Sequence, residues 1–258
     1  MPFLPYGRQT IGDDDIEAVV EVLRGDFLTT GPAVNAFETA LAKFVIAEHA
    51  VACSSGTAAL HLAVMALGIE ANEVAIVPSV TFAATANAVR YVGGEVIFAD
   101  VDPENGLMRP QDFEAAIHAA KDRKIRMVLP VHYAGQCADM PAISEIARSN
   151  GVAVIEDASH ALGGKYWNGN SEWMVGASEH STATVFSFHP VKNIAMGEGG
   201  AVTTKDAQLA DRMYKLRTHG IERDPTNFVN QDQADAPWYY ELTELGFNYR
   251  VTDIQCAL

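Results

Sequence analysis

Short apolar runs alternate with longer segments of helical periodicity along most of this chain. The short runs are apolar at consecutive positions, at residues 74–77, 96–98, 127–131 and 152–155. The helical segments have apolar residues three and four apart, at residues 13–23, 57–67, 82–91, 112–120 and 140–150. A strand that is apolar on both faces has to be covered by helices on both sides, which is the usual environment of a parallel sheet. The alternation therefore predicts a three-layer α/β/α domain around a mainly parallel sheet.

Size and composition narrow the class of protein. The 258 residues suffice to bury a full-sized core, and 48% of them are hydrophobic, which is typical of a globular protein. The formal net charge of −15 argues against non-specific binding to nucleic acid. No apolar run approaches the ~20 residues that a bilayer requires, and the first residues lack the basic and apolar segments of a secretory signal. We therefore expect a cytoplasmic protein that binds neither nucleic acid nor membrane.

Cysteine and histidine patterns give little support to a metal site. Cys53, Cys137 and Cys256 are few and widely spaced, so neither a disulfide framework nor a zinc-binding Cys-x-x-Cys pair is present. The histidines include no HExxH arrangement. We expect no metal.

An aspartate and a lysine stand where a cofactor could use both. Asp157 ends the apolar run VAVIED, and Lys192 closes the segment SFHPVK shortly before the glycine-rich GEGG at residues 197–200. Pyridoxal 5'-phosphate (PLP) needs an amine that forms a Schiff base with its aldehyde. It also needs a carboxylate that keeps its ring nitrogen protonated. A surface lysine and a helix-capping aspartate would be the commoner explanation of either residue alone, but the pair predicts a PLP site.

The segment CSSGT at residues 53–57 opens an expected helix and could hold the phosphate of such a cofactor. The backbone amides at a helix start bind anions, and the hydroxyls of Ser55 and Thr57 beside Gly56 would add donors. Taken alone, this short motif is more often explained by ordinary helix capping. Ser187, a few residues before Lys192, could supply a further hydroxyl.

Two ring-bearing residues complete the hypothesis. Phe82 follows the apolar run at residues 74–77 and could lie flat on a pyridine ring, although core packing is the commoner fate of a phenylalanine. His160 lies a turn beyond Asp157, where it could contact the phenolic oxygen of the cofactor or be a structural histidine.

In this order, the motifs SGT, Phe82, EDASH and SFHPVK closely resemble the DegT/DnrJ/EryC1/StrS nucleotide-sugar aminotransferases, which have PLP fold type I. The resemblance extends from PYGRQ at residues 5–9 to GFNYR at residues 246–250. YGRQ, VHYAGQ and HPVK are most similar to members of the pseudaminic-acid pathway, which aminate C4 of a UDP-linked 4-keto-6-deoxy-N-acetylhexosamine. The resemblance implies a seven-stranded sheet, L-glutamate as the amino donor, and a homodimer whose subunits share their active sites.

The same resemblance assigns roles to single residues. Lys192 would be the catalytic Schiff-base lysine and Asp157 the partner of the ring nitrogen. The remaining cofactor contacts would come from residues on several segments, namely Ser55, Gly56, Thr57, Phe82, His160, Ser187 and, from the neighbouring subunit, Asn248. The substrate would be contacted by Gly7 and by the loop Phe27, Leu28, Thr29 and Thr30.

Two features depart from the family pattern. Residues 193–196 read NIAM where members usually carry threonines, and the smaller C-terminal domain of the family is not found after Leu258. We therefore expect residues 1–258 to be the PLP-binding large domain of a longer protein. We also expect little sugar-aminating activity, and a last helix that frays because Ile254, Ala257 and Leu258 lack partners.

Three alternatives remain open. A related enzyme could use the same residues to aminate C3 or to produce another C4 epimer. A PLP-dependent sugar dehydratase of the same family would carry a histidine in place of Lys192, so the lysine argues against it. A catalytically impaired fragment or scaffold would keep the fold without the reaction.

Overall fold

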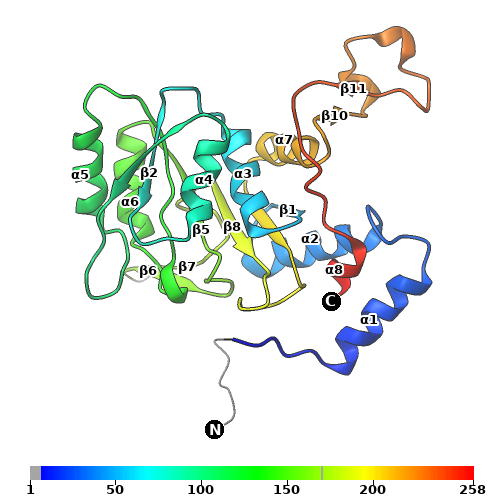
Figure 1. Cartoon of the computed structure of the whole chain (residues 1–258), viewed down its shortest axis with the longest axis horizontal. Coiled ribbons are helices and arrows are strands. Elements are labelled where there is room, and N and C mark those ends of the chain that lie inside the picture. Colours follow the sequence, from blue (N-terminus) through cyan, green and yellow to red (C-terminus); the bar gives the residue numbers. More distant parts are fainter. Residues whose placement is uncertain (1–6, 170) are drawn as a thin grey trace.

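A seven-stranded sheet lies at the centre of the computed structural model, which describes residues 7–169 and 171–258 (Figure 1). Its strands are β1 (His49–Cys53), β2 (Val74–Pro78), β3 (Glu95–Ala99), β4 (Ile125–Val128), β5 (Ala153–Asp157), β8 (Ala183–Ser187) and β9 (Gly200–Thr204). They lie in the order β1-β9-β8-β5-β4-β2-β3. Within the described sheet, β9 runs antiparallel to the other six strands, which are parallel to one another. The mainly parallel sheet and its strand number are confirmed.

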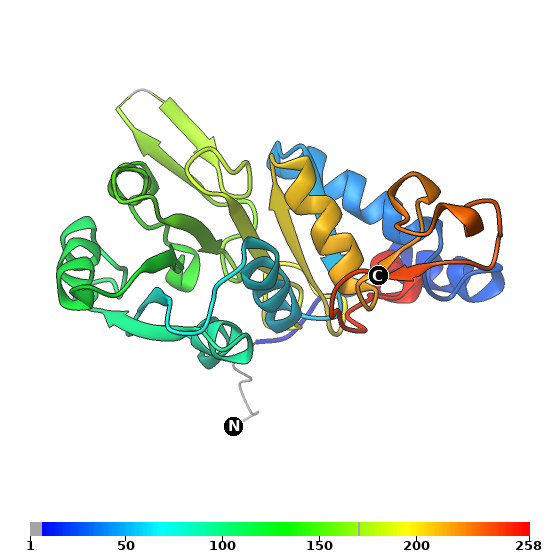
Figure 2. The ribbon, with the colours of Figure 1, turned by 90° about the horizontal axis from the view of Figure 1, so that it is seen from above.

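Helices cover both faces of this sheet (Figure 2). One face packs against α2 (Pro32–Val45), α5 (Pro110–Ala120) and α6 (Met140–Ser149). The other packs against α3 (Gly56–Leu67), α4 (Ala83–Tyr91) and α7 (Ala207–Arg217). Successive residues of one strand belong to opposite cores, as Val154 and Ile155 of β5 show. This is the three-layer arrangement that the apolar strands require.

Most expected elements are present with shifted ends. The run at residues 127–131 is strand only to Val128, because Pro130 has no amide to donate to a sheet. The sequence pattern did not single out α2, α7, β8, β9 or a hairpin of β6 (Lys165–Asn168) and β7 (Ser171–Met174). A short 3-10 helix (Tyr133–Gly135) follows β4.

The last residues are docked rather than frayed. The helix α8 (Asp253–Ala257) packs against α2 and against α1 (Asp13–Arg24). The Asp253 carboxylate, 1% exposed, accepts hydrogen bonds from the amides of Gly31 at 2.8 Å and Ala33 at 2.9 Å. It thereby places a negative charge at the N-terminus of α2, where the helix dipole favours it. The expectation of a frayed end is wrong, since Ile254 and its neighbours are half-buried.

Residues 221–245 project away from the rest of the molecule (Figure 1). This segment holds the short strands β10 (Ile221–Glu222) and β11 (Glu241–Leu242) and two 3-10 helices, Pro225–Asn227 and Gln231–Gln233. Within the ranges described, no helix combines the length and the apolar character needed to cross a membrane.

Candidate functional site

A cavity of about 900 Å³ lies beyond the carboxyl ends of β2, β5 and β8. In α/β sheets, ligands bind at this edge because parallel strands bring the same ends of different segments together. Eight of the predicted cofactor-binding residues line the cavity: Ser55, Gly56, Thr57, Phe82, Asp157, His160, Ser187 and Lys192. The structure therefore brings together segments that are far apart in the sequence.

The N-terminus of α3 forms one wall of the cavity. Ser55 caps the helix by accepting a hydrogen bond from the Ala58 amide at 3.1 Å. The amides of Gly56 and Thr57 precede the first intrahelical hydrogen bond and so have no partner within the helix. A Cβ on Gly56 would lie 2.7 Å from Ser187 Cβ, and a Cβ on Gly200 would lie 2.3 Å from the Ser55 oxygen. Only glycines allow the helix start to lie this close to the ends of β8 and β9. The result is a cradle of free amides and hydroxyls that fits a phosphate group.

Asp157 lies at the end of β5 and is 4% exposed. Its Oδ1 accepts hydrogen bonds from the Ser159 hydroxyl at 2.7 Å and the Ser159 amide at 3.2 Å. Its Oδ2 accepts one from the Thr85 hydroxyl at 2.8 Å. Hydrogen-bond donors of the described residues therefore engage both oxygens of the carboxylate.

Lys192 lies in the loop after β8, half-buried in the cavity wall. Burial lowers the pKa of this amine below its ordinary value, and the Asp157 carboxylate opposes the shift. A lysine with a lowered pKa has more of its neutral form near pH 7 than an exposed lysine. The neutral form is the one that attacks a carbonyl or accepts a proton.

His160 is a second titratable residue in the wall of this cavity. Its Nδ1 accepts a hydrogen bond from the Ala134 amide at 3.3 Å, which requires an unprotonated Nδ1 and leaves the ring proton on Nε2. Burial and the neighbouring Lys192 charge lower the pKa of His160, while Asp157 acts in the opposite direction. The ring of Tyr133 lies at a centroid distance of 6.3 Å. The imidazole is therefore held as a neutral donor.

Phe82 stands just before α4 at the rim of the cavity and is 76% exposed. Core packing is therefore not its role. An aromatic side chain at this position is available to cover a planar ligand.

The predicted substrate residues and Asn248 lie outside this cavity. Gly7 is next to its wall, since a Cβ there would lie 3.5 Å from Val191. The loop Phe27, Leu28, Thr29 and Thr30 is exposed and tied to α8, where Leu28 oxygen accepts from the Asp253 amide. Asn248 is exposed and pairs with Thr218. The roles given to these residues stay predictions.

Several lining residues were not identified from the sequence. They are mostly hydroxyl-bearing residues on segments already singled out: Ser79, Thr81, Tyr133, Ser159 and Glu198. Ser159 follows Asp157 so closely that the Asp-Ala-Ser spacing could have indicated its bond to the carboxylate.

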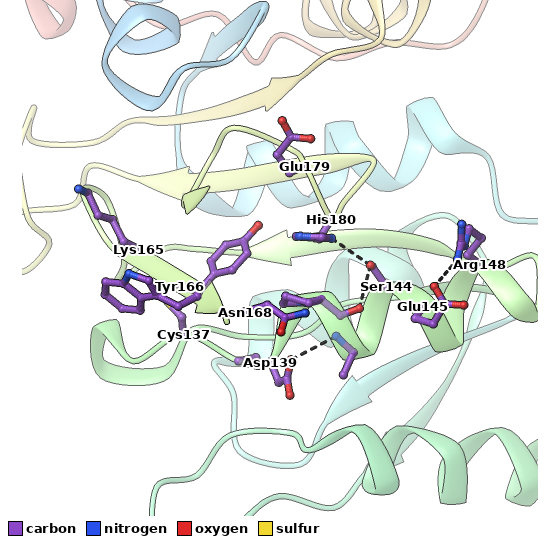
Figure 3. Close-up of a pocket in the computed structure, with 14 residues that line it drawn as sticks. Cys137, Asp139, Ser144, Glu145, Arg148, Lys165, Tyr166, Asn168, Glu179 and His180 are labelled. Carbon is purple, nitrogen blue, oxygen red and sulfur yellow. Dashed lines mark hydrogen bonds and ion pairs between the residues drawn. The ribbon is translucent and has the colours of Figure 1, made fainter. Parts of the chain in front are cut away.

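A second cavity of about 980 Å³ lies between α6 and the β6–β7 hairpin (Figure 3). Its charged side chains are held by partners within the chain, as Lys165 is by Glu172 at 2.6 Å. The Tyr166 hydroxyl and His180 Nε2 are buried without partners in the described ranges. The Ser144 hydroxyl donates its proton to Pro141 oxygen, so it accepts from His180 Nδ1. In the neutral ring, Nε2 of His180 is then an acceptor. The ring of Tyr166 lies at a centroid distance of 5.9 Å from that of His180.

The first cavity, in contrast, has the donor set that PLP requires. The cradle at α3 suits its phosphate, the Asp157 carboxylate suits its protonated ring nitrogen, and the Lys192 amine suits its aldehyde. Nothing in this set calls for a metal.

Comparison with known proteins supports this assignment. The model of the DegT/DnrJ/EryC1/StrS aminotransferase family matches residues 9–258. The spore coat polysaccharide biosynthesis protein SpsC of Bacillus subtilis (strain 168) is 40% identical over 256 residues, which cover 99% of this chain and 62% of SpsC. The chain thus spans less than two thirds of the length of that relative.

Solved structures give the same result. Helicobacter pylori PseC, described as an aminotransferase involved in the biosynthesis of pseudoaminic acid, has a TM-score of 0.83 at 28% identity, over 98% of this chain and 63% of PseC. Bacillus subtilis NtdA, solved with bound cofactor PMP, has a TM-score of 0.82 at 30% identity, over 100% of this chain and 54% of NtdA. The chain belongs to the DegT/DnrJ/EryC1/StrS aminotransferase family, whose cofactor is PLP.

Proposed function

We propose that this chain carries the PLP-binding large domain of an aminotransferase that aminates C4 of a UDP-linked 4-keto-6-deoxy-N-acetylhexosamine, with L-glutamate as the donor. The observation that carries the proposal is the single cavity that gathers Lys192, Asp157 and the cradle at α3. The product would serve the synthesis of a bacterial surface sugar such as pseudaminic acid. PseC, named for pseudoaminic acid, and SpsC, named for a coat polysaccharide, support this substrate class.

The proposed role of each residue follows from its position. When bound, PLP supplies an electron sink for negative charge that develops on the substrate carbon. The cradle of Ser55, Gly56, Thr57 and Ser187 would hold the phosphate, and Phe82 would cover the ring. Asp157 would keep the ring nitrogen protonated, because a nearby carboxylate favours the charged form of that nitrogen.

Lys192 would act twice. Its amine would attach the cofactor, and once free its Nζ would accept the proton that leaves the substrate carbon and return it on the cofactor side. The lowered pKa of Lys192 suits this role, because a general base works best when its pKa lies near the working pH. His160, with its proton on Nε2, would donate toward the oxygen side of the ring.

A direct assay tests the substrate. The PLP-loaded protein, extended at its C-terminus to the length of its relatives, would be incubated with L-glutamate and candidate UDP-keto-sugars, and the product's amino position and stereochemistry would be determined by NMR. Amination at C4 of the 4-keto-6-deoxy-N-acetylhexosamine is the expected outcome. Amination only at C3, or of another C4 epimer, would replace the proposed substrate with that of a related enzyme.

The proposal includes a cytoplasmic homodimer with shared sites. Asn248 is exposed and outside its own cavity, which is consistent with a contact to the phosphate in a neighbouring subunit. Mixing inactive Lys192→Ala and Asn248→Ala chains should restore part of the activity, because each mixed dimer then has one intact composite site. Dimers shown to be mixed that remain inactive would contradict a shared site.

A further inference from the structure

The Asp157 carboxylate is held by donors on both of its oxygens. Two donors from Ser159 engage Oδ1, and the Thr85 hydroxyl engages Oδ2 at 2.8 Å. A carboxylate offers about four lone-pair sites, so one remains free on Oδ2. Asp157 lines the cavity, and this site is the one available to a ligand.

The direction of the hydrogen bonds beyond Asp157 is fixed by chemistry. The Thr85 hydroxyl has one proton, which it gives to Asp157. In the 2.7 Å contact between the hydroxyls of Thr81 and Thr85, Thr81 must therefore be the donor. In the series of hydrogen bonds from Thr81 to Thr85 to Asp157, each hydroxyl donates toward the carboxylate. The carboxylate therefore faces the partial positive charge of the Thr85 hydroxyl proton. Thr85 is 0% exposed and lies in the first turn of α4, whose dipole adds to the same effect.

We propose that Thr85 is a positioning residue that orients the Asp157 carboxylate, so that one Oδ2 lone pair meets the protonated ring nitrogen of PLP. The inference rests on the proposed function only in requiring that PLP binds in this cavity. Without the Thr85 hydroxyl, Oδ2 would lose one hydrogen-bond donor, and the carboxylate would be held less firmly against the ring nitrogen. The ring nitrogen would then be less fully protonated, because a nearby carboxylate favours its charged form.

The neighbouring residue of β5 provides a matched control. Glu156 is also buried, and it accepts from the Thr184 hydroxyl at 3.2 Å and from His132 at 2.8 Å. Thr184, like Thr85, is 0% exposed. Glu156 precedes Asp157 on the strand, so its side chain points to the opposite face of the sheet. Thr184→Val and Thr85→Val therefore remove the same group from equally buried sites, but only Thr85 contacts the residue that faces PLP.

The test uses the whole chain loaded with PLP labelled with 15N at the ring nitrogen. A protonated and a neutral pyridine nitrogen have well-separated 15N chemical shifts. Thr85→Val should move the shift toward the neutral value and weaken PLP binding about tenfold, the usual effect of one hydrogen bond to a charged group. Thr184→Val should leave both unchanged. Asp157→Asn, which removes the carboxylate charge, gives the 15N shift expected when the ring nitrogen has no anionic partner.

A rescue pair covers the case in which Thr85→Val fails to fold. Thr85→Ser and Thr85→Ala both lack the methyl group and differ only in the hydroxyl, so the serine variant should restore the wild-type shift and the alanine variant should not. Equal shifts in the two variants, or an equal effect of Thr184→Val, would overturn the inference. If the wild-type chain binds PLP with a protonated nitrogen but its C-terminally extended form does not aminate the proposed sugar, the proposed substrate would be refuted and the inference would stand. Wild-type protein that does not bind PLP would overturn both.

Discussion

Two cavities among the described residues are nearly equal in size and differ in how the charged side chains of their walls are paired. One measures about 900 Å³ and the other about 980 Å³. In the larger cavity, Lys165 pairs with Glu172, Glu179 pairs with Lys205, and the Asp139 carboxylate caps α6. In the smaller cavity, Asp157 keeps a free lone pair, and burial lowers the pKa of Lys192. The volume of a cavity therefore does not identify the cofactor site. Polar groups at strand ends that are still free to bind a ligand do identify it.

The backbone explains this difference. The smaller cavity lies where β2, β5 and β8 end and α3 begins, so free amides and strand-end side chains converge there. The larger cavity lies beside α6 and a surface hairpin, where Arg148 pairs with Glu145 within α6 and Ser144 contacts His180 (Figure 3). Four experiments test how far this comparison holds.

The largest effect is expected from Lys192, the lysine in the wall of the smaller cavity. Lys192→Ala should abolish the visible absorbance of covalently held PLP and reduce transamination by at least ~100-fold, since it removes both the attachment and the base. The fold should be unchanged, because the side chain is only half-buried. Borohydride reduction followed by peptide mass spectrometry should locate the cofactor on Lys192 in the wild type. Reducible cofactor in the Lys192→Ala variant would show that the attachment is elsewhere.

Glycine substitutions test the cradle. Gly200→Ala would place a Cβ 2.3 Å from the Ser55 oxygen, and Gly56→Ala would place one 2.7 Å from Ser187 Cβ. Each should cost about 1–3 kcal/mol of stability, because backbone has to move, and should weaken PLP binding. Gly25→Ala is the control, since its nearest contact is 3.4 Å. Urea unfolding and PLP titration measure both effects, and normal PLP affinity in Gly200→Ala would refute the cradle.

These residues also show what the sequence could predict. Lys192, Asp157 and the SGT motif follow or precede short apolar runs, and parallel strands bring such ends together without further information. The bond between Thr85 and Asp157 joins residues 72 positions apart and depends on how α4 packs, which no local pattern encodes. The close approach of Gly200 to Ser55 is of the same kind.

The helices and strands that the sequence pattern did not single out differ in the same way, since some have a local pattern and others depend on the tertiary structure. α7 carries Leu209, Ala210, Met213 and Leu216 at helical spacing behind the capping Asp206, so its pattern was available in the sequence. β9 was not detectable locally. Its Thr203 and Thr204 are buried because their hydroxyls donate to the oxygens of Gly176 and Thr182 at 2.8 Å, partners that only the tertiary structure supplies.

A smaller effect concerns pH. The lowered pKa of His160 means that the folded state binds its proton less readily than the unfolded state. Its contribution to stability is complete above the unfolded pKa of about 6.5 and is lost as pH falls through the lowered folded pKa. His160→Gln should therefore differ most from the wild type at pH 7.5 and least at pH 5.5, in urea unfolding measured at both values. An opposite trend would mean that His160 is protonated in the fold.

The smallest effect is expected in the larger cavity. Lys165 is half-exposed and pairs with Glu172 across the β6–β7 hairpin, so its charge is already neutralised in solvent. Removing an exposed pair of this kind costs less than about 1 kcal/mol. Lys165→Ala should thus reduce stability slightly and leave PLP affinity and the visible spectrum unchanged, which makes it the control for Lys192→Ala. A spectral change in Lys165→Ala with unchanged stability would show that the two cavities are coupled. The connection would be β5, because its residues Glu156 and Asp157 have side chains on opposite faces of the sheet. The contrast between a paired and an unpaired cavity would then be the wrong description of the site.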